Sequence, residues 1–232
     1  MYCESITGGI YYFIKLIAKI AFTSRFLSNR LFNIKFLKGS PGLHYFDLVT
    51  FAMYQALMPL LIKGSRILDM GTGPYAVLGI SFWKANGCTV TCADYNKEWV
   101  ALAQENIQNN NAPIKVIWSN LFQNISRDFD FIIFNPPYIP AQIGKKWNLS
   151  EKDNSRWDGG SDGLKTIFRF LSEYSQAKNQ AICCLGINSL FVSNEDIECL
   201  FSKFPKIIVE KKIRKKFFIV NIYIFKKLNK SN

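Results

Sequence analysis

Between Arg66 and Phe134 the sequence alternates between short apolar runs and longer amphipathic stretches, and no other feature restricts the fold as strongly. Short apolar runs indicate buried strands, and amphipathic stretches that end near a glycine or an asparagine indicate helices. Strand-helix-strand units of this kind build a parallel sheet with helices packed on its faces. The sequence therefore predicts an α/β fold.

The same alternation continues toward the end of the chain and predicts seven strands. They are expected at residues 67–70, 89–93, 114–118, 130–134, 181–185, 207–213 and 217–225. Helices are expected between them at residues 76–86, 97–110, 163–177 and 195–204. We therefore expect a doubly wound, seven-stranded, mostly parallel Rossmann-like sheet whose last two strands form a hairpin.

A helical appendage precedes the sheet, and we place the boundary between residues 1–62 and residues 63–232. Residues 10–22 predict an amphipathic helix, and residues 46–61 predict a second apolar helix. Lys15 and Lys19 interrupt the first helix too soon for it to span a bilayer, and it lacks the features of a secretory signal. We expect it to pack on the core; lying on a membrane or clamping a substrate are the alternatives.

The cysteine and histidine content argues against several kinds of site. The six cysteines form no Cys-x-x-Cys pair and five fall in apolar segments, which suits reduced core thiols in a cytoplasmic protein. The single histidine, His44, argues against a histidine-based metal site or a catalytic triad, so no metal is expected. His44 is expected to be structural or to contact a substrate.

The net charge of +12 is concentrated at the two ends of the chain. Residues 1–40 carry six Lys and Arg against one acid, and residues 203–232 carry ten against one. Basic ends fit a surface that meets phosphate, an anionic partner or an anionic membrane. A solvated lysine-rich face explains the same pattern equally well.

Two acidic residues and a pair of glycines indicate a nucleoside site. The pattern Asp69-x-Gly71-x-Gly73 lies where the first strand turns into a helix, and glycines there let the backbone approach a ligand. Asp94 ends the second strand, where a carboxylate can accept hydrogen bonds from both hydroxyls of a ribose. Pro74 removes a backbone donor that a pyrophosphate would use. A nucleoside is therefore expected rather than a dinucleotide.

The fourth strand ends in Asn135-Pro136-Pro137-Tyr138. Two consecutive prolines cannot continue a strand ladder or enter a helix interior, so the strand must stop in a fixed turn. The Asn135 side-chain oxygen and the Pro136 carbonyl can accept hydrogen bonds from an NH2 group, and the Tyr138 ring offers a flat face to a planar group. The motif indicates a planar amine held for attack on an electrophile; an ordinary strand-ending turn is the alternative.

With the glycine loop, the acid after the second strand and the amine motif after the fourth, residues 66–225 resemble the class I S-adenosylmethionine-dependent methyltransferases. The Asn-Pro-Pro-Tyr variant resembles those that methylate planar nitrogens, namely adenine amines in DNA or RNA and the glutamine amide of peptide release factors. The resemblance implies a Rossmann-like methyltransferase with S-adenosyl-L-methionine as its cofactor.

The resemblance also implies roles for individual residues. Those implied to bind the cofactor are Asp69, Gly71, Thr72, Gly73, Asp94, Tyr95, Asn120 and Leu121. Those implied to be catalytic are Asn135, Pro136 and Tyr138. Those implied to bind the substrate are Pro137, Asp158, Gly159 and Gly160.

The region after the amine motif bears on the substrate. Residues 158–164 resemble the Gly-Gly-x-Asp-Gly-Leu run of release-factor glutamine methyltransferases, and Asp162 is also expected to cap the helix at residues 163–177. Residues 141–162 are expected to form a long loop over the carboxyl edge of the sheet, as lids and substrate loops do. The expected substrate is the glutamine amide of a protein such as a release factor. An adenine or guanine amine of RNA or DNA, which the basic ends favour, is the alternative.

Three features depart from the family pattern. Asn120 stands in place of an Asp, Pro74-Tyr75 replaces small residues of the glycine loop, and residues 1–62 are shorter than the usual helical substrate domain. A non-catalytic binding module with a weakened cofactor pocket is therefore a second alternative.

Overall fold

The computed structural model describes residues 23–37, 44–126, 128–149, 151–178, 180–216 and 219–228, with only the backbone of residues 151–153. The helix predicted at residues 10–22 lies outside the described residues.

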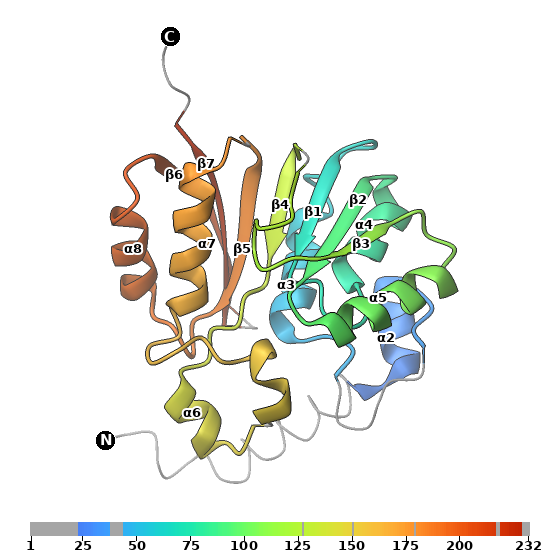
Figure 1. Cartoon of the computed structure of the whole chain (residues 1–232), viewed down its shortest axis with the longest axis horizontal. Helices are drawn as coiled ribbons and strands as arrows, with labels where there is room; N and C mark the ends of the chain where they lie inside the picture. Colours follow the sequence, from blue (N-terminus) through green and yellow to red (C-terminus); the bar gives the residue numbers. More distant parts are fainter. Residues whose placement is uncertain are drawn as a thin grey trace.

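A seven-stranded sheet forms the centre of the molecule, in the order β3-β2-β1-β4-β5-β7-β6 (Figure 1). The strands are β1 Arg66–Met70, β2 Thr89–Asp94, β3 Lys115–Trp118, β4 Phe131–Phe134, β5 Ile182–Asn188, β6 Ile207–Lys215 and β7 Val220–Lys227. The first five strands are parallel, and β7 runs antiparallel to both β5 and β6. The predicted fold, a doubly wound and mostly parallel sheet ending in a hairpin, is confirmed.

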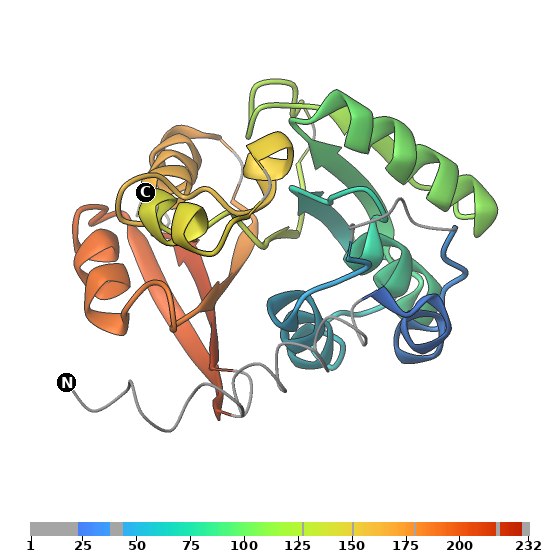
Figure 2. The ribbon, with the colours of Figure 1, turned by 90° about the horizontal axis from the view of Figure 1, so that it is seen from below.

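Helices cover both faces of this sheet. They are α2 Arg25–Phe32, α3 Leu48–Leu57, α4 Val77–Asn86, α5 Lys97–Asn109, α6 Ala141–Lys146, α7 Lys165–Gln176 and α8 Asn194–Ser202. Right-handed crossovers that run toward opposite edges of a sheet place their helices on opposite faces. Accordingly, α4 and α7 lie on opposite faces of the sheet (Figure 2). α3 lies on the same face as α4, and α8 lies on the same face as α7. On the second face, the rings of Phe170 in α7 and Phe134 in β4 are 5.0 Å apart.

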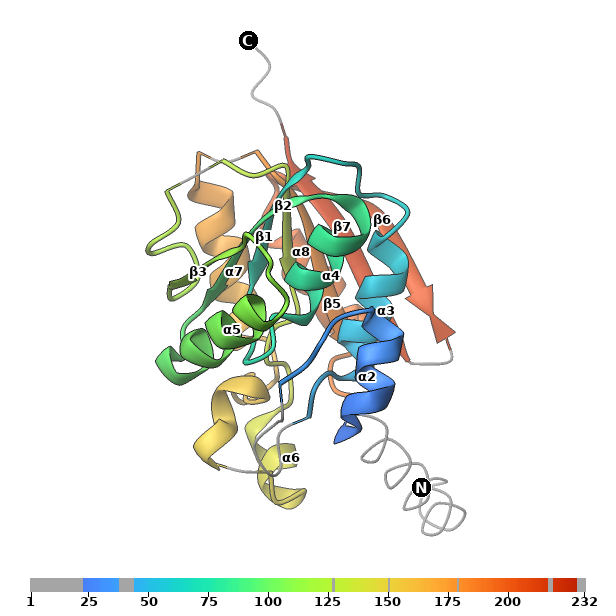
Figure 3. The same cartoon turned by 90° about the vertical axis from the view of Figure 1, so that its right-hand side faces the viewer.

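The N-terminal helices belong to the same hydrophobic core as the sheet. α2 and α3 lie beside each other (Figure 3), and the rings of Phe32 and Phe46 are 4.9 Å apart. α3 begins after Asp47, whose carboxylate accepts a hydrogen bond from Thr50 N at 2.7 Å. It ends earlier than the predicted residue 61: Met58 still has helical backbone angles, but Pro59 has no N–H with which to continue the helical hydrogen bonds.

The segment that crosses the carboxyl edge differs from the expected long loop. Residues 141–162 contain α6 and a 3-10 helix, η1 Glu151–Arg156. α6 packs closely on the ring of Trp157. A Cβ at Gly144 would overlap that ring, so only glycine allows this approach. The segment also folds back on the amine motif, as Ile139 N donates to Trp157 O at 2.7 Å. Since its backbone donors find partners locally, this segment is folded rather than a structureless loop.

The predicted cap of the next helix is also wrong. α7 begins at Lys165 with Leu164 as its N-cap residue, whereas Asp162, two residues before the cap, accepts a hydrogen bond from Leu164 N at 2.9 Å. Asp162 therefore closes a local turn before the helix instead of capping it.

Two further observations concern the predictions from composition. Cys88, Cys92, Cys183 and Cys184 are buried free thiols, as expected, while Cys199 is exposed. Within the part of the chain that the structure describes, no helix is both long enough and apolar enough to cross a membrane.

Candidate active site

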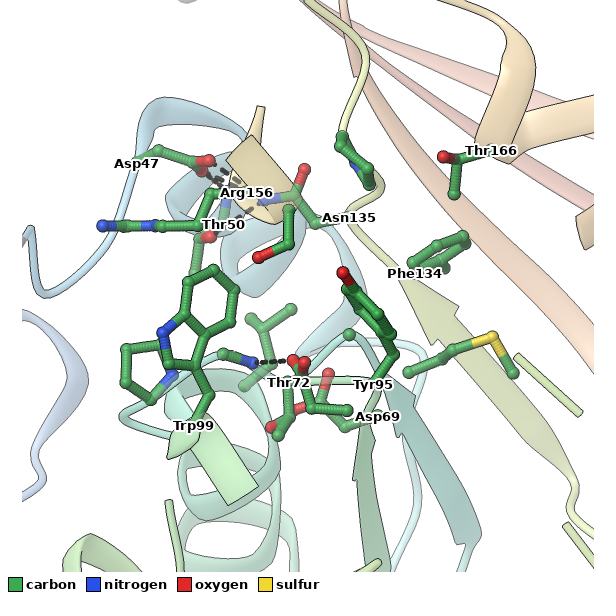
Figure 4. A pocket seen from close by; sticks show the side chains of 18 of the residues that line it. Asp47, Thr50, Asp69, Thr72, Tyr95, Trp99, Phe134, Asn135, Arg156 and Thr166 are labelled. Atoms are coloured by element: carbon green, nitrogen blue, oxygen red, sulfur yellow. Dashed lines mark hydrogen bonds between the residues drawn. The ribbon is translucent and has the colours of Figure 1, made fainter. Parts of the chain in front are cut away.

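A cavity of about 400 Å³ lies at the carboxyl ends of β1, β2 and β4 (Figure 4). Its volume is in the range of pockets that hold small molecules, roughly 300–1,000 Å³. The predicted site residues that line it are Asp69, Gly71, Thr72, Gly73, Asp94, Tyr95, Asn120, Leu121, Asn135, Pro137 and Asp158. The remaining four predicted residues are not part of the cavity lining, although they neighbour lining residues in the sequence. They are Pro136, Tyr138, Gly159 and Gly160.

The glycine loop adopts a conformation that depends on its glycines. Gly71 and Gly73 have φ values of 64° and 68°, in the left-handed region that favours glycine. A Cβ on Gly71 would also lie 3.0 Å from the ring of Phe134 in β4. Between them, Thr72 N donates to the carbonyl of Ala93 in β2 at 3.0 Å. The loop is thus held against both neighbouring strands while its backbone faces the cavity.

Asp69 lies buried at the base of this loop. One of its carboxylate oxygens accepts from Thr72 Oγ1 at 2.6 Å and from Gly79 N at 3.0 Å. Burial raises the pKa of Asp69 to about 6, while these two hydrogen bonds act in the opposite direction. A ligand that enters the cavity can therefore change the protonation state of the Asp69 carboxyl group.

Asp94 fixes the loop from the next strand. Its carboxylate accepts from Gly73 N and from Asn96 N, both at 2.9 Å. Burial raises the pKa of Asp94, and hydrogen bonds from the backbone oppose that shift. Each carboxylate oxygen has a second lone pair, so Asp94 can still accept hydrogen bonds from a ligand.

Residues that follow β2 and β3 also line the cavity. Leu121 has a positive φ of 50°, and the Asn120 side-chain oxygen accepts from Arg169 Nη2 of α7 at 3.2 Å. Tyr95, after β2, has 55 % of its surface exposed, and its carbonyl accepts from Trp118 Nε1 at 2.7 Å. These residues form one wall of the cavity and leave the Tyr95 ring available for stacking.

Asn135 is held by α3. Its side-chain nitrogen lies 3.1 and 3.2 Å from the two carboxylate oxygens of Asp47, and 3.2 Å from Thr50 Oγ1. Figure 4 shows the amide nitrogen turned toward these two residues and the oxygen turned away from them. That oxygen is buried and has no hydrogen-bond partner within the described structure. An acceptor buried without a partner is unusual and calls for a ligand or a water.

The rest of the amine motif is packed into the protein. Tyr138 is 8 % exposed, and its ring lies 6.0 Å from that of Phe191. Burial, with a smaller contribution from the charge of Asp47, raises the pKa of Tyr138 well above its ordinary value. A Cβ at Gly163 would overlap the Tyr138 carbonyl, so the chain after η1 returns directly against the motif.

Residues around η1 form the outer wall. Asp158 lines the cavity and accepts from Gly160 N at 2.8 Å, while Gly159 N donates to Ile139 O at 2.9 Å. Ser155 also lines the cavity, and its hydroxyl is buried without a partner within the described structure. Two buried polar atoms without partners, Asn135 Oδ1 and Ser155 Oγ, therefore belong to residues of one cavity.

Sequence reasoning missed several residues of the site. They are Asp47, Thr50, Trp99, Ser155 and Arg156. Asp47 precedes an apolar helix and has the signature of a helix cap, so its position was detectable, but its contact with Asn135 across 88 residues was not.

Three comparisons with known proteins agree with this geometry. Residues 43–150 match the family described as methyltransferase small domain. Over 112 residues the chain is 35 % identical to a putative protein N5-glutamine methyltransferase of Methanocaldococcus jannaschii, covering 48 % of this chain and 55 % of that protein. Over 152 residues it is 29 % identical to the release factor glutamine methyltransferase of Streptococcus pneumoniae, covering 64 % and 53 %. The chain thus spans about half the length of these relatives.

Solved structures show the same fold. A methyltransferase from Pyrococcus furiosus superposes with a TM-score of 0.67 at 19 % identity, covering 92 % of this chain and 98 % of that one. The 16S rRNA N2 G1207 methyltransferase of T. thermophilus, solved in complex with AdoMet and guanosine, superposes with a TM-score of 0.56 at 19 % identity, covering 82 % and 45 %. The resemblance to S-adenosylmethionine-dependent methyltransferases is therefore confirmed in sequence and in fold.

Proposed function

We propose that this chain is an S-adenosylmethionine-dependent N-methyltransferase that acts on a planar amine, and that the amine is the side-chain amide of a glutamine in a protein. The observation that carries this proposal is the Asn135 oxygen, which is buried, unpaired and belongs to a residue of the cavity. An acceptor in that state suits an NH2 group of a substrate.

The residues of the inner cavity fit S-adenosyl-L-methionine. Gly71 and Gly73 leave the backbone of the loop open to a ligand, and Asp94 at the end of β2 has lone pairs for ribose hydroxyls. The exposed Tyr95 ring and the side chains of Asn120 and Leu121 suit an adenine. The buried Asp69 supplies negative charge toward a cationic ligand. The replacement of Asp by Asn at position 120 removes a charge but keeps an acceptor, so the pocket is adequate for binding.

S-Adenosyl-L-methionine supplies a methyl group on a sulfonium, which is a good electrophile without further activation. The protein then has to orient the acceptor nitrogen and exclude water. Asn135 Oδ1 accepts one hydrogen of the NH2 group and draws electron density toward the nitrogen. A hydrogen bond from the second hydrogen to the carbonyl of Pro136, a residue outside the cavity lining, stays a prediction. Residues 154–156 and 158 form one wall of the cavity and shield part of it from water. A strong general base is not required, because the methylated nitrogen becomes acidic and releases its extra proton to water.

A glutamine amide is favoured over other planar amines by the relatives, whose names specify protein glutamine or release factor substrates. Asn135 Oδ1 and Ser155 Oγ also suit an amide, which presents an NH2 donor beside a carbonyl acceptor. The roles of Tyr138, Gly159 and Gly160 are then to shape the turn and η1 around the cavity. Direct stacking of Tyr138 on the substrate stays a prediction.

A nucleic-acid amine is the second candidate, and the charge of the last two strands favours it. The basic residues of β6 and its end are Lys211, Lys212, Arg214, Lys215 and Lys216. Lys215 pairs with Val220, which in turn pairs with Asn188 at the carboxyl end of β5, so this end of β6 lies at the same edge as the cavity. If RNA or DNA is the substrate, binding falls steeply with salt and is lost when these five residues are neutralised.

The test is transfer of labelled methyl from S-adenosyl-L-methionine to a release factor, a ribosomal and transfer RNA mixture, and duplex DNA offered in parallel. Label on the factor that disappears when its acceptor glutamine is replaced supports the proposal. Label on nucleic acid favours the second candidate. Failure to bind S-adenosyl-L-methionine contradicts both and favours a non-catalytic binding module.

A further inference from the structure

The side chain of Asn135 is anchored by a helix that precedes it by more than eighty residues. We infer that Asp47, assisted by Thr50, is a positioning residue that fixes the Asn135 amide with its oxygen as the acceptor for the substrate amine; this inference rests on the proposed function. Asp47 touches no reacting atom in this scheme and acts through Asn135.

The hydrogen-bond partners around Asn135 permit only one orientation of its side-chain amide. The Asn135 NH2 group has two hydrogens, and the acceptors around it are the two oxygens of Asp47 and the hydroxyl of Thr50, at 3.1 to 3.2 Å. A carboxylate only accepts hydrogen bonds, so rotating the amide by 180° would place Asn135 Oδ1 against the oxygens of Asp47. Asp47 therefore excludes the rotated form by repulsion as well as by the loss of hydrogen bonds.

The excluded orientation would be unproductive. In it, the Asn135 NH2 group would face the cavity and meet the NH2 group of the substrate, donor against donor. In the observed orientation the oxygen is buried and unpaired, ready to accept. The negative charge of Asp47 also polarises the amide, since a hydrogen bond to a charged acceptor on one side strengthens the acceptor on the other.

Asp47 is itself held in place through α3. Its Oδ1 accepts from Thr50 N at 2.7 Å as the cap of α3. α3 packs on the sheet with Val49 and Met53, both fully buried. A Cβ at Gly186 of β5 would lie 2.5 Å from Val49 Cγ1, so no side chain separates the helix from the strand at this point. The anchor of Asn135 is therefore part of the rigid core.

Two variants separate this role from helix capping. Asp47→Ser keeps a good N-cap residue but is too short to hold the Asn135 amide. We expect kcat to fall about tenfold or more, as for the loss of a charge-assisted hydrogen bond, while the Kd of S-adenosyl-L-methionine changes less than about twofold and Tm is nearly unchanged. Asp128→Asn, at an exposed aspartate outside the cavity, is the control for loss of one charge. An unchanged kcat in Asp47→Ser overturns the inference.

A reciprocal exchange provides a sharper test. In Asn135→Asp two carboxylates face each other, and activity is lost. In the double variant Asp47→Asn with Asn135→Asp, the new amide at position 47 donates to one oxygen of the carboxylate at position 135, which leaves the other oxygen as acceptor. We expect kcat at least about tenfold above that of Asn135→Asp alone. A double variant no more active than the single one overturns the inference, because a helix cap alone would not couple the two sites.

A second readout does not depend on methyl transfer. The side-chain NH2 protons of Asn135, assigned by their absence in Asn135→Ala, should be shifted downfield in the NMR spectrum by the Asp47 carboxylate and move upfield in Asp47→Ser. Signals that do not respond to Asp47→Ser contradict the anchoring itself. If the wild-type protein transfers no methyl to any substrate but these signals do respond, the proposed function fails and the anchor stands.

Discussion

The guanidinium of Arg156 lies over the ring of Trp99, with its central carbon 5.8 Å from the ring centroid. Arg156 belongs to η1 and Trp99 to α5, and both line the cavity. Arg156 Nη2 also lies 3.4 Å from the carbonyl oxygen of His44, which precedes α3. The Arg156 side chain thus links the segment around η1, which forms the outer wall of the cavity, to two separate parts of the fold.

Arg156→Ala should therefore loosen the cover of the cavity without unfolding the protein. A cation-π contact at a partly exposed site is worth about 0.5–1 kcal/mol, so S-adenosyl-L-methionine should dissociate about two to five times faster. Stopped-flow measurement of the dissociation rate checks this, with Arg25→Ala, on the exposed side of α2, as the control. Equal rates for the two variants would show that Arg156 does not control access.

Asn135→Ala should abolish turnover with little effect on the cofactor. The removed oxygen is unpaired in the structure and acts only on the substrate amine, so its loss affects the step in which the nitrogen attacks. We expect kcat to fall by about a hundredfold, the usual scale for loss of one preorganised hydrogen-bonding group. Calorimetry should give an unchanged Kd for S-adenosyl-L-methionine. Parallel losses of binding and turnover would contradict the role given to Asn135, and Asn124→Ala, outside the cavity, is the control.

Much of the fold followed from sequence periodicity. The five parallel strands and the glycine loop were predicted because apolar runs, glycines and prolines act over a few neighbouring residues. The structure of residues 141–162 was not predicted because their helices are held by a tertiary contact, the packing of Gly144 against Trp157. The local sequence pattern does not indicate this contact. Local composition there is polar, and polar composition alone indicates a loop.

The residues of the site also fall into those that the sequence could predict and those that it could not. Asp69, Gly71 and Asp94 were detectable because each sits at the end of a predicted strand, where the topology of the sheet brings ligand-binding groups together. Asp47 and Arg156 were not, because their roles depend on which helix lies against which strand. Periodicity shows that α3 has an apolar face but does not show the strand on which that face packs.

The pH dependence of stability should reveal the buried Asp69. Burial raises the pKa of Asp69 from 3.8 to about 6 in the folded protein, so the folded state holds this proton more tightly than the unfolded chain does. The contribution of Asp69 to the free energy of unfolding is then greatest below about pH 4, declines as the pH rises, and is lost above about pH 6. The decline amounts to about 3 kcal/mol.

Urea unfolding between pH 4 and 7, compared for the wild type and Asp69→Asn, isolates this effect, because the neutral variant cannot titrate at that position. Affinity for the cationic cofactor should follow the opposite course and increase through pH 6 as Asp69 ionises. Identical pH profiles for the two proteins would show that Asp69 does not titrate in this range.

Gly186→Ala should impair both stability and catalysis, through α3. A Cβ at this position of β5 would overlap Met53 Sδ and lie 2.5 Å from Val49 Cγ1, so the helix has to move away from the sheet. Overpacking of this kind costs about 1–3 kcal/mol, which lowers Tm. Because α3 carries Asp47 and Thr50, its displacement also loosens the Asn135 amide, and kcat should fall while the Kd of S-adenosyl-L-methionine stays the same. Adding Met53→Ala relieves part of the overlap, so the double variant should be less destabilised than the sum of the two single ones. Additive losses would mean that Gly186 and Met53 do not compete for the same space, and that the sheet does not set the position of the helix that anchors Asn135.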